Sequence, residues 1–325
     1  MGFPWNFTGN PNPCKDNWQG LICRYVAPYN HIASITLDAY NLTGTIPDSI
    51  GAFSYLRVIE IAVSALSGPI PQTIGNLTNL QVMYISGGYL SGQLPNSVGN
   101  LQSLTQVDLQ MNDLSGTIPA SLGKLQSLQT LNLAQNKIGG SIPPELGLLT
   151  TLPSLLLYAN RLTGTIPPSL GNMTQLYDLY LEVNQLSGSI PASLSNLTRL
   201  RNLDLSNNAL TGTVPEGVYG LNQVRNFYLH TNHLSGIIPD CIANLTALQE
   251  LQLSNNDFNG SIPATLGTLV NLQYIQFDSN HLTGSIPESL YALTGLQRLD
   301  LDTNDLTGTL PVLLNKLLTT KADFA

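Results

Sequence analysis

Twelve prolines recur along this chain at an unbroken interval of 24 residues, from Pro47 to Pro311. A glycine stands three residues before each of them, and an apolar residue stands immediately before each. Self-similarity at a fixed period of this length is typical of repeat proteins, in which each unit stacks only on its neighbours. We therefore predict a solenoid. A stacked array also escapes the size at which a single globular core stops growing, so all 325 residues can belong to it.

The repeating unit reads LxxLxLxxNxLSGxIPxxLGxL, and its first part alternates apolar with polar residues. In the segment 202–206, Leu203 and Leu205 are expected to point into the core from a short strand, with the polar side chains outward. Because one unit cannot bury its apolar side alone, the strands of successive units should form one parallel sheet.

An asparagine occupies the turn position in nine consecutive repeats, from Asn112 to Asn304. We expect its side-chain amide to satisfy the backbone of its own turn and of adjacent turns. The first three repeats carry Tyr40, Ser64 and Gly88 at this position, so their turns should be held less securely.

Over residues 32–319 the unit LSGxIPxxLGxL resembles the plant-specific class of leucine-rich repeats. Residues 14–23 are similar to the N-terminal cap of that family, in which C-x-W-x-G-[VI]-x-C encloses a disulfide. The resemblance implies an α/β solenoid, a right-handed superhelix with a parallel sheet on its concave face and loops or 3-10 turns on its convex face. It also implies a cap at 1–31 with a Cys14–Cys23 disulfide, twelve repeats at 32–319, and a polar tail at 320–325 in place of a C-terminal cap.

Composition excludes several classes of function. A net charge of −8, with 12 Lys and Arg against 20 Asp and Glu, argues against a nucleic-acid partner, which needs a basic surface. No phosphate-binding loop, nucleophile elbow or zinc-binding helix motif is present, so we expect neither an enzyme nor a cofactor. Asp278, Asp300 and Asp302 could attract a cation, but Ca²⁺ needs six or more oxygen ligands, so no metal site is expected.

The cysteines and the glycosylation signals predict an oxidising, extracellular location. The chain would then be secreted or be the ectodomain of a membrane protein whose span is not in this chain. No apolar run approaches the roughly 20 residues that cross a bilayer. Cys241 remains either a small residue beside the proline turn or one half of an intermolecular disulfide. N-linked glycans are expected at seven sequons, of which Asn76, Asn172, Asn196 and Asn244 share one phase of the repeat: Asn6, Asn41, Asn76, Asn172, Asn196, Asn244 and Asn259.

Outward-facing strand positions are the expected contact surface, because they neither pack in the core nor form a turn. In repeats six to nine they combine tyrosine with acidic and basic residues, and tyrosine and arginine commonly anchor binding hot spots. Tyrosine also covers neighbouring strands, so a purely structural role is the alternative. The predicted ligand-binding residues are Tyr158, Tyr177, Asp178, Tyr180, Glu182, Arg201, Asp204, Arg225, Tyr228 and His230.

The leading hypothesis for function is an extracellular recognition module that binds a peptide, a protein or a glycan on its strand face. Many peptide receptors of the family hold a terminal carboxylate with an Arg-x-Arg pair on strand positions, and here those positions lack it. One alternative is a structural glycoprotein that self-associates end to end through its uncapped C-terminal repeat. Others are an inhibitor of a secreted wall-degrading enzyme and, less favoured because no sustained flat threonine array is visible, an ice-binding protein.

Overall fold

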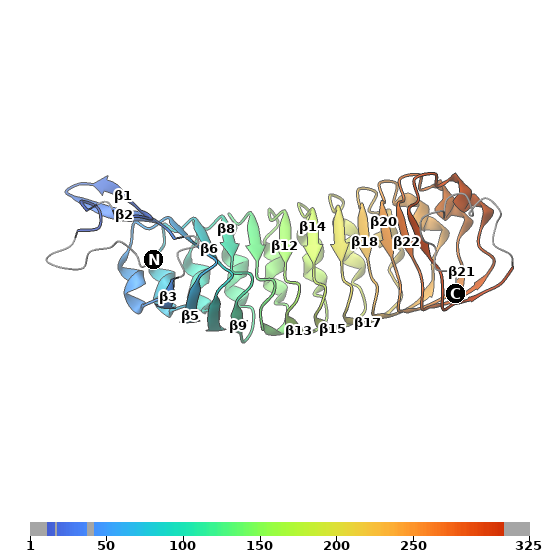
Figure 1. Ribbon diagram of the computed structural model, residues 1–325, viewed down its shortest axis with the longest axis horizontal. Coiled ribbons are helices and arrows are strands. Elements are labelled where there is room, and N and C mark those ends of the chain that lie inside the picture. Colours follow the sequence, from blue (N-terminus) through green and yellow to red (C-terminus); the bar gives the residue numbers. More distant parts are fainter. Residues whose placement is uncertain (1–11, 17, 38–41, 309–325) are drawn as a thin grey trace. The chain divides into compact units, whose positions relative to one another are not determined.

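The computed structural model describes residues 12–16, 18–37 and 42–308. The chain forms two compact units, Met1–Arg161 and Leu162–Ala325. In both units each repeat contributes a strand to a parallel sheet, then a tight turn, a second short strand and a 3-10 helix, with the strands and the helices on opposite sides of the repeat (Figure 1). This confirms the predicted leucine-rich-repeat solenoid with parallel strands and 3-10 turns.

In unit 1 the main sheet starts with an antiparallel hairpin and continues with parallel strands. β2 crosses the expected boundary between cap and repeats at residues 31 and 32, so one strand belongs to both. The sheet order is β1 (Leu21–Val26), β2 (Tyr29–Thr36), β4 (Val58–Ala62), β6 (Val82–Ser86), β8 (Gln106–Asp108), β10 (Thr130–Asn132) and β12 (Ser154–Leu156).

In unit 2 the main sheet is parallel, and successive strands pair in a register of 24 residues, as in Leu203 opposite Phe227. Its order is β14 (Asp178–Tyr180), β16 (Asn202–Asp204), β18 (Asn226–Tyr228), β20 (Glu250–Gln252), β22 (Tyr274–Gln276) and β24 (Arg298–Asp300). Because the register equals the repeat length, equivalent side chains of successive repeats lie in straight rows across the sheet.

A second set of short parallel strands, which the sequence analysis did not foresee, follows the turn in each unit. Unit 1 contains β3 (Thr43–Thr45), β5 (Ala65–Pro69), β7 (Tyr89–Gln93), β9 (Asp113–Ser115) and β11 (Gly139–Ser141). Unit 2 contains β13 (Arg161–Gly164), β15 (Gln185–Gly188), β17 (Ala209–Gly212), β19 (His233–Ile237), β21 (Asp257–Ser261), β23 (His281–Gly284) and β25 (Asp305–Leu306).

Each second strand ends within two residues of a left-handed glycine such as Gly212, whose φ of 78° only glycine adopts without strain. An extended proline then precedes a 3-10 helix, so the repeated proline marks where a helix begins. The 3-10 helices are η1 (Asp48–Ala52), η2 (Gln72–Asn76), η3 (Asn96–Asn100), η4 (Ala120–Lys124), η5 (Pro144–Leu148), η6 (Pro168–Asn172), η7 (Ala192–Asn196), η8 (Glu216–Gly220), η9 (Asp240–Asn244), η10 (Ala264–Thr268) and η11 (Glu288–Ala292).

The core is a column of apolar side chains repeated at equivalent positions. Leu203, Leu205 and Leu210 of one repeat are at most 1% exposed, as the alternating pattern predicts. Successive 3-10 helices approach so closely that a Cβ at Gly171 would clash with the carbonyl oxygen of Ser193. This close approach explains the glycine of the LGxL segment.

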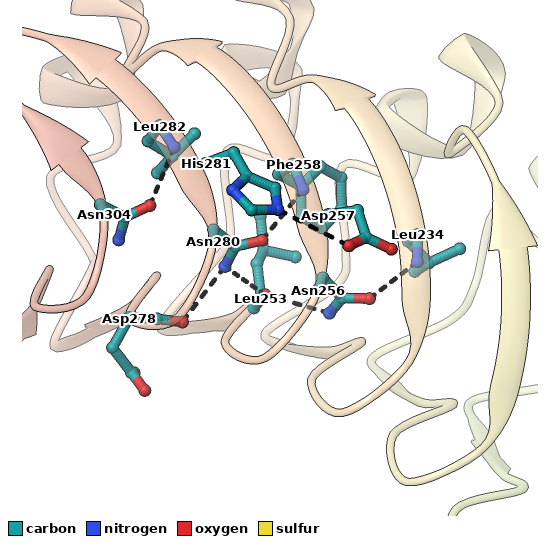
Figure 2. Close-up of polar contacts among 10 residues, drawn as sticks. All are labelled: Leu234, Leu253, Asn256, Asp257, Phe258, Asp278, Asn280, His281, Leu282 and Asn304. Carbon is teal, nitrogen blue, oxygen red and sulfur yellow. Dashed lines mark hydrogen bonds and ion pairs between the residues drawn. The ribbon is translucent and has the colours of Figure 1, made fainter.

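The asparagine turns behave as predicted. Nδ2 of Asn280 donates to the carbonyl oxygens of Phe277 (3.0 Å) and of Leu253 in the preceding repeat (3.0 Å), while its Oδ1 accepts from the backbone N–H of Phe258 (3.0 Å). Figure 2 shows this asparagine between its neighbours Asn256 and Asn304, which occupy the same position in their repeats. Each asparagine therefore joins its own turn to the repeat before it.

Turns without asparagine keep the same backbone. Val63 and Gly87 have φ values of 47° and 64°, close to the 57° of Met111 ahead of Asn112. Ser64 supplies one weak bond, in which its Oγ accepts from Leu66 N at 3.4 Å. Stacking on neighbouring repeats therefore imposes the turn even where the side-chain bonds are few. The replacement at Tyr40, the end of the twelfth repeat and the predicted tail at 320–325 lie outside the described residues.

Candidate functional site

The outward side chains of the main sheet in unit 2 form a continuous polar surface, which we call the strand face. It comprises the side chains of β14, β16, β18, β20, β22 and β24 that point away from the core, together with those of the residue before and the two residues after each strand. The pairing of β14 with β16 and of β16 with β18 places Tyr180 beside Asp204 and Asp204 beside Tyr228. Strand spacing of about 4.8 Å brings these side chains within contact distance.

Arginines gather at the start of the strands. The guanidinium of Arg201 lies 4.9 Å from the centroid of the Tyr177 ring, a cation–π contact. Nη1 of Arg199, which the sequence analysis did not select, donates to the Tyr177 hydroxyl at 3.5 Å. Arg225, ahead of β18, is exposed. This edge of the strand face thus presents cationic donors over an aromatic ring.

The first outward row is a ladder of side-chain hydrogen bonds. Nδ2 of Asn202 donates to Oδ1 of Asp178 at 2.6 Å, and Nδ2 of Asn226 donates to Oδ1 of Asn202 at 2.6 Å. Asp178 was predicted to contact ligand, and one of its oxygens is already used within this ladder.

Asp204 is only 9% exposed, since its Oδ1 accepts from both the backbone N–H (2.9 Å) and the hydroxyl (2.6 Å) of Ser206. Burial raises the pKa of Asp204, while the bonds from Ser206 and the nearby His230 oppose that rise. This carboxylate shapes the strand face and contributes little exposed area to it.

Glu182 is the least satisfied group on the strand face. Burial, reinforced by the negative charge of Asp204, raises the pKa of Glu182 to about 7. Its Oε2 is buried and has no hydrogen-bond partner among the described residues. A buried acceptor without a donor is costly, so this atom favours a donor supplied from outside the chain.

Tyr228 and His230 occupy the centre of the strand face. The Tyr228 hydroxyl donates to Oε2 of Glu250 at 2.6 Å, and burial together with that carboxylate raises the pKa of the tyrosine. Burial lowers the pKa of His230, against the pull of Asp204 and Asp278, and its Nδ1 lies 3.2 Å from the Thr231 hydroxyl. The sequence analysis did not select Glu250, although it shares its row with Asp178 and Tyr274.

Tyr158 belongs to unit 1, where it follows β12 and is half-buried. Its carbonyl oxygen accepts from Gln135 N at 2.9 Å and from Nδ2 of Asn160 at 3.2 Å. The other nine predicted ligand-binding residues therefore lie on the strand face of unit 2, and Tyr158 belongs to unit 1.

A hollow of about 320 Å³ opens over β18, β20, β22 and β24, and the sequence analysis had not predicted it. Within the described ranges, no three His, Cys, Asp or Glu side chains are arranged to hold a metal ion. The residues around the hollow are His230, Gln252, Ser254, Asn255, Gln276, Asp278, Arg298, Asp300 and Asp302.

The remaining sequence predictions concern covalent features. Cys14 and Cys23 form the predicted disulfide, with Cα atoms 5.6 Å apart. Cys241 in η9 is half-buried and has a free thiol. Among the described sequons, Asn76, Asn172, Asn196 and Asn244 each end a 3-10 helix and are exposed, as is Asn259 in β21. Asn6 and Asn41 lie outside the described residues.

No helix in the described part of the chain is long and apolar enough to cross a membrane.

Family models match most of the repeat region. A leucine-rich repeat region model matches residues 107–212, and two leucine-rich repeat models match residues 198–258 and residues 271–293 and 295–317. The crystal structure of PEPR1–AtPEP1 superposes with a TM-score of 0.82 at 32% identity, covering 93% of this chain and 45% of that one. The chain belongs to the plant-type extracellular leucine-rich-repeat family.

Other solved leucine-rich-repeat structures show the same likeness. The Arabidopsis receptor kinase HAESA, in complex with the peptide hormone IDA and the co-receptor SERK1, has a TM-score of 0.79 at 34% identity over 92% of this chain and 50% of that one. A plant ice-binding protein has a TM-score of 0.67 at 27% identity over 90% of this chain and 86% of that one. This chain thus spans about half the length of the receptor chains that it matches. Comparison with curated proteins found no match.

Proposed function

We propose that this leucine-rich-repeat chain is the ligand-recognition part of an extracellular receptor-type protein and binds a peptide along the strand face of unit 2. The observation that carries the proposal is the strand face itself, which presents half-buried tyrosines, an arginine packed on the Tyr177 ring and the unpartnered Oε2 of Glu182. Tyrosine and arginine are the residues most enriched in binding hot spots. An extended peptide also offers backbone N–H donors at regular intervals, which suits a buried acceptor.

The comparisons support a peptide or protein ligand, and the peptide complexes among them favour a peptide for the strand face. HAESA is matched in complex with a peptide hormone and a co-receptor, and RGFR1, described as a plant peptide hormone receptor in complex with RGF2, matches at 30% identity with a TM-score of 0.60. The carboxylates of Asp204 and Glu250 accept hydrogen bonds from Ser206 and Tyr228, and the proposal gives them a structural role.

To test the proposal, the chain would be immobilised and challenged with a phage-displayed library of short random peptides. We expect recovered peptides to bind Tyr180→Ala and Tyr228→Ala about tenfold or more weakly, because a hot-spot tyrosine contributes about 1 to 2 kcal/mol. Isothermal titration calorimetry measures the affinity. Tyr228→Phe separates loss of the ring from loss of the bond to Glu250.

Tyr84→Ala is the matched control, because Tyr84 occupies the same outward position in β6 of unit 1 and is equally half-buried. Its affinity for the peptides should equal that of the unmodified chain. Recovery of no peptide, or unchanged affinity in both unit 2 variants with intact circular dichroism, would overturn the proposal and leave an enzyme inhibitor or a self-associating glycoprotein as the leading alternatives.

We also propose N-linked glycans at the exposed sequons, which lie on 3-10 helices and a second strand and so leave the strand face open. When the chain is expressed through a eukaryotic secretory pathway, Asn172→Gln, Asn196→Gln and Asn244→Gln should each lose the mass of one glycan. Mass spectrometry before and after enzymatic deglycosylation measures the change. Equal masses for the variants and the unmodified chain would show these sequons to be unused.

Ice binding is a second candidate, favoured by the likeness to a plant ice-binding protein. In unit 2 the second strands expose Thr163 and Thr211, and Thr213 directly after β17 is exposed as well, but Asn259 and Ile237 interrupt the same columns. An ice-recrystallisation assay discriminates the two functions, because inhibition that survives Tyr180→Ala would place activity away from the strand face.

A further inference from the structure

The hollow over β18 to β24 combines a ligand-sized volume with an uneven balance of charge. Three aspartates and one arginine line it, together with uncharged amides, an alcohol and His230. Nε of Arg298 is 2.6 Å from Oδ2 of Asp300, which also accepts from Nε2 of Gln276 at 2.9 Å. The only cation of the lining is therefore neutralised by one of the three carboxylates.

Asp278 and Asp302 have no basic side chain within ion-pair distance in the described part of the chain. Asp278 accepts a hydrogen bond from the Ser254 hydroxyl, and Asp302 accepts one from the hydroxyl of Thr303 at 3.2 Å. Figure 2 shows the Asp278 carboxylate directed away from Asn280 and the asparagine turns. Both acids are half-buried.

The two carboxylates lie on adjacent strands. Gln276 pairs with Asp300, so Asp278 and Asp302, two residues further along, occupy the same row, and Ser279 N donates to the carbonyl oxygen of Asp302 at 3.0 Å. Like charges about one strand spacing apart repel, and a cation between them relieves that repulsion. His230 on the same side does not compete, because burial lowers its pKa and favours its neutral form.

The identity of the cation follows from the geometry. A metal ion needs several oxygens converging on one point, and among the described residues no three His, Cys, Asp or Glu side chains are arranged to hold one. A hollow of about 320 Å³ suits an organic cation, whose hydrogen-bond donors reach carboxylates that do not converge. Guanidinium in particular carries five donors in a planar fork, which can bridge two carboxylates and the amides of Gln252 and Gln276.

We propose that this hollow is a specificity subsite that receives a cationic side chain, arginine or lysine, of a bound peptide. The inference rests on the proposed peptide-binding function and adds the class of residue that the ligand must carry. Because the hollow lies over β18 to β24 and the arginines lie ahead of β16 and β18, the strand face has an acidic and a basic region. A linear peptide with charges of both signs would then bind in one direction only.

The experiment repeats the peptide selection on the unmodified chain and on Asp278→Asn/Asp302→Asn, which keeps side-chain size and removes both unpaired charges. We expect arginine or lysine at one recurrent position in peptides from the unmodified chain and no such enrichment from the double variant. A recovered peptide should lose about tenfold in affinity for the double variant, and changing its cationic residue to glutamine should cost the unmodified chain the same factor.

Asp257→Asn is the matched control, since it removes the same charge from a second strand of the same unit, where Asp257 meets only the exposed His281 at 3.8 Å. Peptides that bind without cationic enrichment, or that bind the double variant equally well, would overturn the subsite and leave the peptide-binding function intact.

If no peptide is recovered, the proposed function fails, and N-acetyl-arginine amide tests the hollow directly. Shifts of the Asp278 and Asp302 backbone amides in nuclear magnetic resonance spectra, absent with N-acetyl-citrulline amide, would support a cation subsite. Identical spectra with both probes would exclude it.

Discussion

The asparagine turns and the strand face of unit 2 lie in the same repeats but treat buried polar atoms in opposite ways. At the turns, Asn232 is 6% exposed, its Nδ2 donates to the carbonyls of Leu205 and Leu229 at 3.0 Å each, and its Oδ1 accepts from Leu210 N at 2.9 Å. On the strand face, Oε2 of Glu182 is buried without a partner. At the turns the buried polar atoms stabilise the fold through hydrogen bonds, while on the strand face one buried polar atom has no partner among the described residues.

Removing a turn asparagine should have the largest effect. In Asn232→Ala the N–H of Leu210 and two carbonyl oxygens lose their side-chain partner, so we expect a loss of about 2 to 4 kcal/mol in the free energy of unfolding. Ser64→Ala removes a single long bond and should cost less than about 1 kcal/mol. Urea unfolding and amide exchange at Leu210 measure the difference, and equal losses would show that the turns do not depend on asparagine.

Neutralising Glu182 should have a smaller effect that depends on pH. Its pKa is raised from 4.5 to about 7 in the folded chain, so between these values the unfolded chain has released a proton that the folded chain still holds. Stability therefore falls as pH rises through this window, and the cost is complete above about pH 7. In Glu182→Gln that fall should disappear. Melting temperatures at pH 5 and pH 8 check it, and parallel pH profiles for the two chains would contradict it.

Restoring the missing asparagine should have the smallest effect. Asparagine at Gly88 would place a side-chain acceptor near Leu66 N, which now donates a 3.4 Å bond to the hydroxyl of Ser64. Its Cβ would lie 3.1 Å from Oδ1 of Asn112, a tight contact that offsets part of the gain. We expect Gly88→Asn to stabilise the chain by about 0.5 to 1 kcal/mol in urea unfolding. A clear loss of stability would mean that the third turn is shaped for glycine.

The sequence predicts the asparagine turns far better than the strand face. The role of Asn112 to Asn304 depends on backbone atoms whose positions the 24-residue period repeats, so one unit suffices to predict all nine. The bond from Tyr228 to Glu250 depends on two side chains that the period does not relate. The hollow likewise depends on a small residue, Ser254, beside the acidic Asp278, a combination that becomes visible only when side-chain volumes are placed in space. The second strands were missed because a left-handed glycine at or beside the end of each segment interrupts the alternation of apolar and polar residues that indicates a strand.

The asparagine turns also bear on how such a chain can change in length. Each Asn bonds its own turn and the repeat before it through the same atoms, so the turn bonds at the junctions of unit 2 are chemically alike. A gene that gains or loses one whole repeat by unequal recombination therefore creates a junction identical to those already present. Loss of a single codon in a turn would instead displace an asparagine from the carbonyl oxygens of two repeats at once. Substitutions on the strand face and insertions of complete repeats keep the bonds of the asparagine turns. Short insertions or deletions in the turns would break these bonds.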